Sequence, residues 1–567
     1  MSDYHLQETG KGTYTLIYRA GNEIRLHSAY DPLVESERAV SQFKKGRASH
    51  IVVSGVALGY HIAELKKRFP DCHVLAVEHD REVVDLARKA CSSNLESVTV
   101  FSDRAGLLAY FDTFDMSSFK GIAHYIHRPS YMLYRKFYDG MVSEVKQQIA
   151  SRVSDILTRF EFEERWISNI FRNIPHLQEA VPVHELFGRF KGYPGIIVSA
   201  GPSLRRNMDL LEKFHDRALI VCVDTAYKVL GRKKIIPHIV MTLDAQKYSV
   251  KHFLGVPPSS TVLLADVVSY PGILRSCTGE KILSTTSKYF SDGRGNTFRE
   301  TTPVMDWLDN YMPPLGDIQS GGSVATSAFD FLLNLGCDPI ILTGQDLAYT
   351  GREIHSSGTY HNDDWLPLCS RIQNLDTINQ KVIRKRSIKY VPSYGGAGTV
   401  ITDFVLDLYR GWFEDSAEKV GITVINATEG GVRIRHTVEK TLEECLREYP
   451  RQNTAPSAIL GDILRDFRGR ETRQLHQGLL KAVKALEDIS AFINNEKTNR
   501  DFQQRLNTLI DKHQLTQLIH PFLRKSEMYI SRHDMDEEKA GEIITRDILT
   551  AVQKLIPMIG KCAGEFT

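Results

Sequence analysis

Short apolar segments that end in an aspartate recur along the middle of this chain. The four aspartates are Asp224, Asp244, Asp266 and Asp346. Helical patterns separate the apolar segments, which predicts parallel strands joined by helices and hence a doubly wound α/β domain. Ligands of such sheets bind beyond the carboxyl ends of the strands, so we expect a site among these aspartates. Each aspartate could instead cap the helix that follows it.

The 567 residues divide into four predicted segments. Residues 1–150 show a β-α-β-α pattern, which predicts a Rossmann-like α/β domain. Residues 151–190 are predicted to be a helical connector, and residues 191–450 form the central domain. Residues 455–567 carry apolar side chains at helical spacing, which predicts an antiparallel α-helical bundle with a break between helices at Pro521. We expect this bundle to serve interaction or assembly, because it carries no obvious chemistry.

The sequence also predicts two local features. A β-hairpin is predicted from residues 14–18 and 23–26 around a turn at Gly21-Asn22. In the central domain, residues 204–214 are predicted to form one helix after the turn at residues 200–203.

Charge and composition argue against several classes of protein. The chain has 71 Lys and Arg against 69 Asp and Glu, a net charge of +2, which argues against a dedicated nucleic-acid or anionic-membrane binder. The eight cysteines include no C-x-x-C pair, so a structural zinc site is not expected. We see no signal-peptide core, and no apolar run approaches a membrane span of roughly 20 residues. We therefore expect a cytoplasmic protein with reduced thiols, in an oligomeric state that stays open.

Two glycine-bearing turns precede predicted helices, where backbone N–H groups and the helix dipole favour an anion. In the first, Gly201-Pro202-Ser203, the serine hydroxyl could cap the helix or donate to a phosphate, and Asn207 lies one helical turn further on. The second turn consists of Ser320, Gly321, Gly322 and Ser323. The first turn could be an ordinary capped turn, because it lacks the phosphate-loop pattern of nucleotide kinases, and the second repeats the same arrangement of hydroxyls and amides at a helix start.

A polar loop follows the buried strand predicted over residues 339–343. It contains Gln345, Asp346, Tyr349, His355 and Tyr360. Histidine is the usual proton acceptor near neutral pH, and tyrosine hydroxyls can stabilise a departing phosphate. Thr428 and Glu429 lie in a later turn that could line the same cleft.

Four motifs in this order resemble the motility-associated factor (Maf) family of bacterial flagellin glycosyltransferases. They are SAGPSLRRN at residues 199–207, QSGGSVATSA at 319–328, GQDLAYTGREIH at 344–355 and INATEGG at 425–431. The resemblance extends to the N-terminal segment LHSAYDPLVESER. It implies transfer of a nonulosonic acid, such as pseudaminic or legionaminic acid, from a CMP-sugar to serine or threonine of flagellin in the cytoplasm. It also implies a central domain similar to that of bacterial sialyltransferases.

The resemblance implies roles for the residues of these motifs. The nucleotide-sugar pocket would involve Gly201, Pro202, Ser203, Asn207, Asp224, Thr225, Asp244, Ser320, Gly321, Gly322, Ser323, Gln345, Thr428 and Glu429. Tyr349 and Tyr360 would face the leaving phosphate. The related sialyltransferases carry a base histidine after the tyrosine-bearing loop, but residues 391–396 contain none, so His355 is the predicted base, with Asp346 as the alternative. The implied transfer is inverting and needs the CMP-sugar as co-substrate; a divalent metal stays possible.

Three other functions fit parts of the sequence. A related domain occurs in proteins that transfer diphosphate from ATP to hydroxymethylpterin, where the strand-end aspartates would hold Mg²⁺. The N-terminal domain has the outline of an S-adenosylmethionine-dependent methyltransferase, with Gly55 and Gly59 in the first turn and Glu78 at the end of the next strand. A non-catalytic protein that binds flagellin would keep the fold without the transfer.

Overall fold

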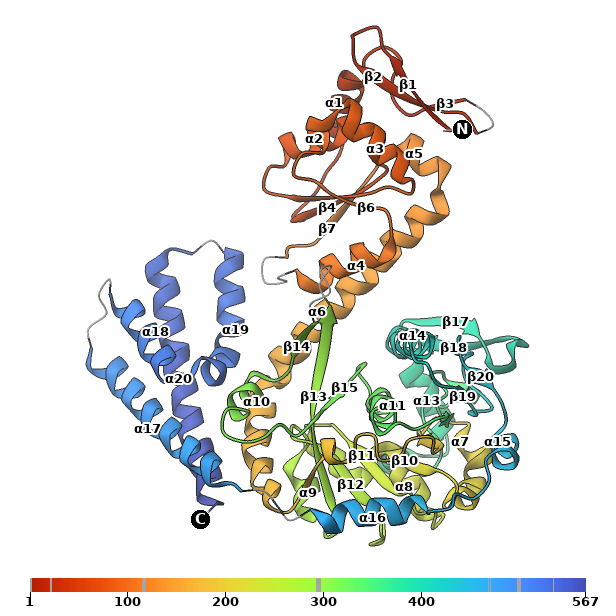
Figure 1. The fold of residues 1–567 in the computed structure, drawn as a ribbon, viewed down its shortest axis with the longest axis vertical. Helices are drawn as coiled ribbons and strands as arrows, with labels where there is room; N and C mark the ends of the chain where they lie inside the picture. The colour runs from red at the N-terminus through yellow and green to blue at the C-terminus, as the bar shows by residue number, and fades with distance from the viewer. Residues whose placement is uncertain are drawn as a thin grey trace. The chain divides into compact units, whose positions relative to one another are not determined.

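The computed structural model describes residues 3–20, 23–114, 119–291, 297–467, 469, 471–496, 501–533 and 535–566. Its parallel sheets and many helices confirm the predicted α/β class (Figure 1). The chain forms two compact units. Unit 1 comprises Met1–Glu161, Phe290–Phe298 and Leu523–Ile544; unit 2 comprises Phe162–Tyr289, Arg299–Phe522 and Thr545–Thr567.

Unit 1 begins with a small antiparallel sheet of three strands, β1 (Tyr4–Glu8), β2 (Tyr14–Tyr18) and β3 (Ile24–Arg25). The predicted hairpin is confirmed, because Tyr18 of β2 lies opposite Ile24 of β3. The predicted turn at Gly21-Asn22 lies outside the described residues. The first strand was not predicted; it pairs with β2 along its whole length.

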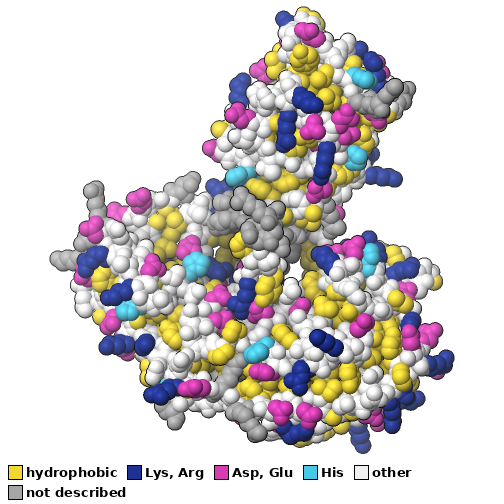
Figure 2. All heavy atoms as spheres, viewed as in Figure 1, with side chains coloured by type: hydrophobic (Ala, Val, Ile, Leu, Met, Phe, Trp, Pro, Cys, Tyr) yellow, Lys and Arg dark blue, Asp and Glu magenta, His cyan; other side chains and the backbone are white. Residues whose placement is uncertain are grey.

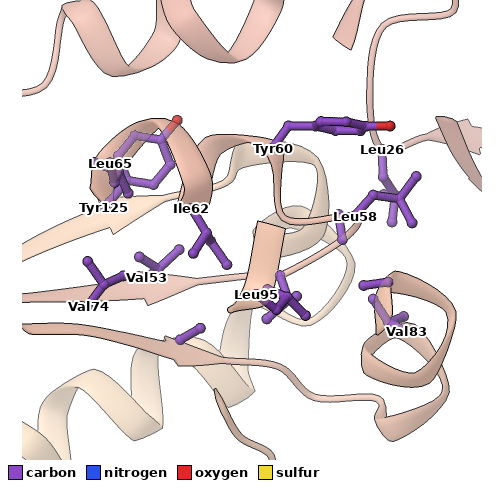
Figure 3. Packing of buried hydrophobic residues seen from close by; sticks show 14 of the residues in the cluster. Leu26, Val53, Leu58, Tyr60, Ile62, Leu65, Val74, Val83, Leu95 and Tyr125 are labelled. Carbon is purple, nitrogen blue, oxygen red and sulfur yellow. The ribbon is translucent and has the colours of Figure 1, made fainter. Parts of the chain in front are cut away.

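The larger sheet of unit 1 is parallel, in the order β6-β5-β4-β7. Its strands are β4 (His50–Ser54), β5 (His73–Val77), β6 (Thr99–Phe101) and β7 (Ile122–Ile126). The helices are α1 (Pro32–Ser41), α2 (Tyr60–Arg68), α3 (Arg81–Ala90), α4 (Arg104–Thr113) and α5 (Arg128–Leu133). Apolar side chains of α2, including Ile62 and Leu65, pack in one core with Val53 and Val74 of the strands (Figure 3). Burial of such apolar area is the main stabilising contribution to this layer.

A long helix, α6 (Arg135–Asn173), follows this sheet. The helix of the predicted connector therefore begins at Arg135, before the predicted start at residue 151. Its first turns belong to the core of unit 1, since Tyr138, Met141 and Val145 recur at helical spacing and are buried against that sheet.

Unit 2 is built on a sheet in the order β14-β13-β12-β11-β10-β9-β16-β19-β20, with β8 and β15 pairing to β13. The central strands are β9 (Gly195–Val198), β10 (Leu219–Val223), β11 (Ile239–Thr242), β12 (Val262–Asp266), β13 (Lys281–Ser291), β16 (Ile340–Thr343) and β19 (Val424–Asn426). The shorter strands are β8 (Val181–Pro182), β14 (Thr297–Glu300), β15 (Asp317–Gln319) and β20 (Val438–Glu439). The pairs from β9 to β13, and those of β16 with β9 and β19, are parallel. Because β9 lies between β10 and β16, the chain reverses its direction of travel across the sheet at β9, where α/β sheets form their ligand crevice.

Helices connect these strands. They are α7 (Leu204–Asn207), α8 (Asp224–Arg232), α9 (Pro271–Ser276), α10 (Pro303–Leu308), α11 (Val324–Leu335), α12 (Tyr360–Trp365), α13 (Leu375–Ile383), α14 (Phe404–Lys419), α15 (Leu442–Glu448) and α16 (Pro456–Asp466). Two further strands, β17 (Ile388–Pro392) and β18 (Thr399–Asp403), form a separate antiparallel pair. The single helix predicted over residues 204–214 is wrong in detail. The α-helix ends at Asn207, whose φ of −130° leaves the helical region, and the chain continues as a 3₁₀ helix, η5 (Met208–Phe214).

The C-terminal region is helical, as predicted. It contains α17 (Arg473–Asn495), α18 (Phe502–Lys512), α19 (Thr516–His533) and α20 (Glu537–Gly564). The predicted break at Pro521 is wrong, because this proline lies inside α19. The helix continues through Pro521 although this residue has no N–H to donate to the preceding turn.

Acidic and basic side chains are interspersed over the face shown in Figure 2, in line with the small net charge. All eight cysteines are free thiols. Among the helices of the described ranges, none is both long and apolar enough to cross a membrane.

Candidate functional site

The turns that follow β9, β16 and β19 in unit 2 pack directly against one another. The backbone N–H of Gly201 donates to the Gly344 carbonyl at 2.8 Å, and that of Val432 donates to the Asp346 carbonyl at 2.8 Å. A Cβ atom on Gly201 would clash with the Gly344 carbonyl, and one on Gly431 would clash with the Asp346 backbone. Gly201 of the first motif and Gly431 of the fourth motif therefore permit close contact between loops in this structure.

Asp346 lies at the centre of these turns and holds Ser203. Its Oδ1 accepts from the Ser203 N–H at 2.8 Å and from the Ser203 hydroxyl at 2.9 Å, and the hydroxyl also contacts Oδ2. Both side chains are buried. The predicted cap of α7 by Ser203 is not formed, because the nearby carboxylate takes the hydroxyl instead. Burial raises the pKa of Asp346 to about 6, although the bonds from Ser203 oppose the shift.

Asn207, which follows β9, forms hydrogen bonds with residues at the ends of β16 and β19. Its Nδ2 donates to the Ala427 carbonyl and to Glu429 Oε1, both at 3.0 Å, and its Oδ1 accepts from the Thr343 hydroxyl at 3.1 Å. Next to it, Thr428 Oγ1 accepts from the Gln345 N–H at 3.2 Å. These four predicted pocket residues thus form an internal network, and their contact with a nucleotide stays a prediction.

The second glycine turn is closed by its own helix. The hydroxyls of Ser323 and Thr326 form a capping box at the start of α11. Thr326 Oγ1 also accepts from the Gly321 N–H at 3.0 Å, and Ser320 Oγ accepts from the Gly322 N–H at 3.1 Å. A side chain on Gly321 would overlap the ring of Trp412. Packing and capping account for this turn, so a role with the donor carboxylate stays a prediction.

Tyr349 is buried, and its hydroxyl donates to Asp403 Oδ2 at 2.5 Å. The other oxygen of Asp403 accepts from the Leu406 N–H at 2.9 Å and caps α14. The Tyr349 hydroxyl therefore points at a structural carboxylate in this structure.

The carboxyl ends of β10 and β11 bring Asp224 and Asp244 close enough for each charge to act on the other. Asp224 is buried; its Oδ1 accepts from the Thr225 N–H at 2.6 Å, and its Oδ2 accepts from the Thr242 hydroxyl at 2.8 Å. Asp244 is half-buried, and its Oδ1 accepts from the Gln246 N–H at 2.9 Å. Burial raises the pKa of both aspartates, and the charge of Asp224 raises that of Asp244 further.

Three imidazoles and one phenol gather beside these carboxylates. This His–Tyr cluster consists of His252, His355, Tyr360 and His361. The rings of His355 and His361 stack with centroids 5.0 Å apart, and the Tyr360 ring lies 3.9 Å from His361 and 4.4 Å from His252. His252 is 6% exposed, and its Nδ1 has no hydrogen-bond partner. The cluster contains the predicted His355 and Tyr360, and it adds two histidines that the sequence analysis missed.

Ion pairs fasten the helix that carries Tyr360 and His361. Arg232 of α8 donates to both oxygens of Asp363 at 2.8 Å, and Lys228 pairs with the same carboxylate at 2.8 Å. Lys251, in the 3₁₀ helix η6 (Lys247–His252), pairs with Asp364 at 2.7 Å. Helix α12 is thereby held to the two segments that follow Asp224 and Asp244.

The imidazoles are neutral near pH 7 in this structure. Burial lowers the pKa of His355 to about 3 and those of His252 and His361 to about 4. The charges of Asp364 and Asp224 oppose the shift at His361, and that of Asp244 opposes it at His252. A neutral imidazole can accept a proton, and an anionic ligand beside it would raise its pKa towards neutrality. The arrangement places proton-accepting groups beside two carboxylates at the carboxyl ends of β10 and β11.

Known proteins match this chain in two ways: a family model matches the region of the candidate site, and a solved structure is similar over the whole chain. Residues 168–352 match the family model of 6-hydroxymethylpterin diphosphokinase MptE-like proteins. That segment contains Asp224, Asp244 and His252 but ends before Tyr360 and His361.

Two uncharacterized proteins of Treponema pallidum (strain Nichols) are related in sequence. One is 25% identical over 270 residues, which is 46% of this chain and 46% of that protein. Another is 28% identical over 220 residues, 39% of this chain and 44% of that protein. The matches thus span about half the length of these relatives.

Among solved structures, the Maf glycosyltransferase from Magnetospirillum magneticum AMB-1 is similar over 100% of this chain and 93% of its own, with a TM-score of 0.55 and 14% sequence identity. Identity this low establishes likeness of fold alone. The chain therefore has the fold of a Maf glycosyltransferase, with a central segment similar to MptE-like proteins.

Proposed function

We propose that this chain is a glycosyltransferase that transfers a nonulosonic acid from a CMP-sugar to serine or threonine of flagellin, with inversion at the sugar carbon. The His–Tyr cluster beside Asp224 and Asp244 carries the proposal, because it places proton acceptors at the carboxyl ends of the parallel strands. The fold likeness to a Maf glycosyltransferase supports it. The four motifs supply the donor class and the acceptor.

In the proposed transfer, the acceptor hydroxyl oxygen forms a bond to the anomeric carbon while the bond from that carbon to the CMP phosphate breaks. CMP leaves with the bonding electron pair. His361 is our first choice for the group that takes the acceptor proton. Its ring adjoins that of Tyr360, and the charge of Asp224 raises its pKa. His355, which stacks on His361, is the alternative, and the Tyr360 hydroxyl would stabilise the leaving phosphate.

The test measures the mass of flagellin after incubation with the protein and CMP-pseudaminic or CMP-legionaminic acid. One nonulosonate added per modified site is expected with the wild-type protein, and loss of the product is expected with H361N. His436→Asn is the matched control: His436 is exposed and has a φ of +63°, which asparagine tolerates well. Unchanged flagellin mass with both donors would contradict the proposal, and binding of flagellin without modification would favour the non-catalytic alternative.

A second candidate is a Mg²⁺-dependent diphosphokinase, which the MptE-like match over residues 168–352 favours. Mg²⁺ is commonly held by one or two carboxylates together with substrate phosphates, and Asp224 and Asp244 could supply them. Both oxygens of Asp224 already accept hydrogen bonds, and within the described residues no group of three or more His, Cys, Asp or Glu is arranged to hold a metal. The residues present thus fit a metal only if the nucleotide completes its coordination.

Calorimetric titration of CMP, CDP and ATP, with and without Mg²⁺, separates the two functions. Glycosyl transfer predicts CMP binding that needs no metal and weakens in D224A. ATP binding that requires Mg²⁺, with no CMP binding, would support the diphosphokinase instead.

A further inference from the structure

A cavity of about 550 Å³ lies at the edge of the central sheet opposite the His–Tyr cluster. It is lined by the residues that lead into β11, β12 and β13, among them His238, Thr261 and Lys281. Helix α16 forms its outer wall through Leu460, Gly461 and other residues, at the lower edge of the sheet in Figure 1. None of its lining residues belongs to the candidate site.

His238 is a buried histidine in the lining of this cavity. The residue is 4% exposed, and its Nδ1 accepts from the Ile220 N–H at 3.0 Å. A neutral ring whose Nδ1 accepts carries its proton on Nε2, and Nε2 makes no hydrogen bond of normal geometry, although the His215 backbone lies close enough to act on the ring. Burial lowers the pKa of His238 to about 3, which keeps the ring neutral. Buried donors without a partner are rare in native proteins, so a bound acceptor group is a natural explanation.

The rest of the lining combines hydroxyls, one ring face and a balanced pair of charges. Ser259, Ser260, Thr278 and Ser457 contribute hydroxyls, which both donate and accept. The imidazole of His215 stacks on that of His238 with centroids 4.2 Å apart. Lys281 pairs with Glu179 at 3.0 Å, so the one cation of this lining is already compensated, and Glu280 adds a further negative charge. The charges of the cavity disfavour an anionic ligand.

We propose that this cavity is a second binding site that takes a neutral polyhydroxylated molecule of the sugar class, with one of its oxygens accepting from His238 Nε2. Ligand hydroxyls match a wall whose groups both donate and accept, and the imidazoles and leucines of the lining suit the C–H faces of a sugar ring. The volume is within the range of about 300–1,000 Å³ that small-molecule sites occupy.

The binding test uses calorimetry or ligand-observed NMR on the full chain. The probes are glucose, galactose, mannose and N-acetylglucosamine, compared with glucose 6-phosphate and orthophosphate. At least one neutral sugar is expected to bind, with the dissociation constant raised tenfold or more by Gly461→Leu, which fills the cavity from α16. A Cβ at Gly461 meets only the end of the Arg465 side chain, so the variant is expected to fold. Gly560→Leu, on a helix position with open space around it, is the control and is expected to bind normally.

A second variant tests the role of His238 itself. His238→Asn keeps an acceptor near the Ile220 N–H but removes the Nε2 donor, and we expect sugar binding to weaken tenfold or more. Equal sugar binding by wild type and G461L, binding of the phosphorylated probes alone, or the absence of binding by all four sugars would overturn the proposal. Should H238N fail to fold, G461L decides the question. Flagellin modification, measured in parallel, is expected to survive G461L, so the failure of one proposal is separate from that of the other.

Discussion

The two parallel sheets of this chain both place an acidic residue at a strand end, but the groups around that residue differ. In unit 1, Glu78 follows β5 and is 2% exposed; its oxygens accept from the Val56 N–H at 2.7 Å, the His79 N–H at 2.9 Å and the Tyr138 hydroxyl at 2.8 Å. In unit 2, Asp244 is half-buried, and Asp224 and Asp244 share their surroundings with three histidines. Both oxygens of Asp224, like those of Glu78, accept hydrogen bonds from the fold itself. The difference lies in the neutral imidazoles beside Asp224 and Asp244, which give unit 2 the groups for proton transfer.

The glycines of the turn after β4 also indicate a structural role for this part of unit 1. A side chain on Gly55 would overlap Ser130, and one on Gly59 would press against Asn94 and Leu95. The place where a methyltransferase would hold its cofactor ribose, beside Glu78, is occupied by the Tyr138 hydroxyl. Binding of S-adenosylmethionine is therefore not supported by the geometry of this turn.

The largest effect expected is on the stability of unit 1. Glu78→Ala would leave buried N–H groups and the Tyr138 hydroxyl without an acceptor, and we expect the free energy of unfolding to fall by roughly 3 kcal/mol or more. Denaturant titration of the variant, of Glu37→Ala as an exposed control and of Asp224→Asn measures the contrast. A loss in D224N as large as that in E78A would remove the distinction between the two acids.

The second largest effect is expected on the rate of sugar transfer to flagellin. His361→Asn should lower kcat for flagellin modification about 100-fold or more, which is typical of a lost general base, and should leave the unfolding midpoint nearly unchanged. Steady-state kinetics as a function of pH provide the measurement. Full activity in H361N, together with loss of activity in H355N, would assign the role of general base to His355 instead.

The third effect is the pH dependence of stability in unit 1, where His27, His61 and His127 are buried together. Burial lowers the pKa of His27 to about 3 and that of His61 to about 4, from 6.5, and that of His127 well below 6.5. Below pH 6.5 the unfolded chain binds more protons, so stability should fall by about 1.4 kcal/mol per pH unit for each histidine as pH drops towards 4. The raised pKa of Glu78 acts in the opposite direction, because the folded state then takes up a proton first.

His61→Gln should reduce this slope by the contribution of one histidine. Urea titrations between pH 5 and 7 measure it, with His5→Gln as the exposed control. An unchanged slope in H61Q would show that the ring is not held neutral by burial.

The smallest effect concerns Thr225, whose hydroxyl donates to Asp224 Oδ1 at 3.1 Å. Thr225→Val should lower the free energy of unfolding by about 1 kcal/mol and raise the pKa of Asp224 further, since one bond to its charged form is lost. The pH profile of CMP binding tests the second part. Thr550→Val, which removes an exposed hydroxyl bonded to the Arg546 carbonyl, is the control. An unaltered profile would indicate that Asp224 does not contact the nucleotide.

Much of the fold could be predicted because hydrophobic periodicity reports strands and helices directly. The strands around residues 195–199, 218–224, 261–266 and 339–343 appear within a few residues of their predicted limits. The break of the helix after Asn207 could not be predicted, because it depends on side-chain bonds to the ends of distant strands. The inclusion of residues 135–150 in α6 depends likewise on packing against the sheet of unit 1.

The candidate site was predictable only in part. Strand ends marked Asp224 and Asp244, and the loop after β16 marked His355 and Tyr360. His252 was missed because it lies in a 3₁₀ helix with no motif around it and reaches the cluster only through the fold. His361 did carry a signal, since it directly follows Tyr360 and precedes the two aspartates that anchor α12.

That anchoring has a consequence for how such proteins diverge. The imidazole of His361 is located by ion pairs from α12 to α8 and η6, and the 16 residues between β16 and α12 do not set its position alone. The loss of the partners of Asp363 and Asp364 is therefore expected to displace the histidine more than a change in the parts of that loop that make no contact with the site. Relatives that keep this histidine are expected to keep the charge pattern across α8, η6 and α12 as well.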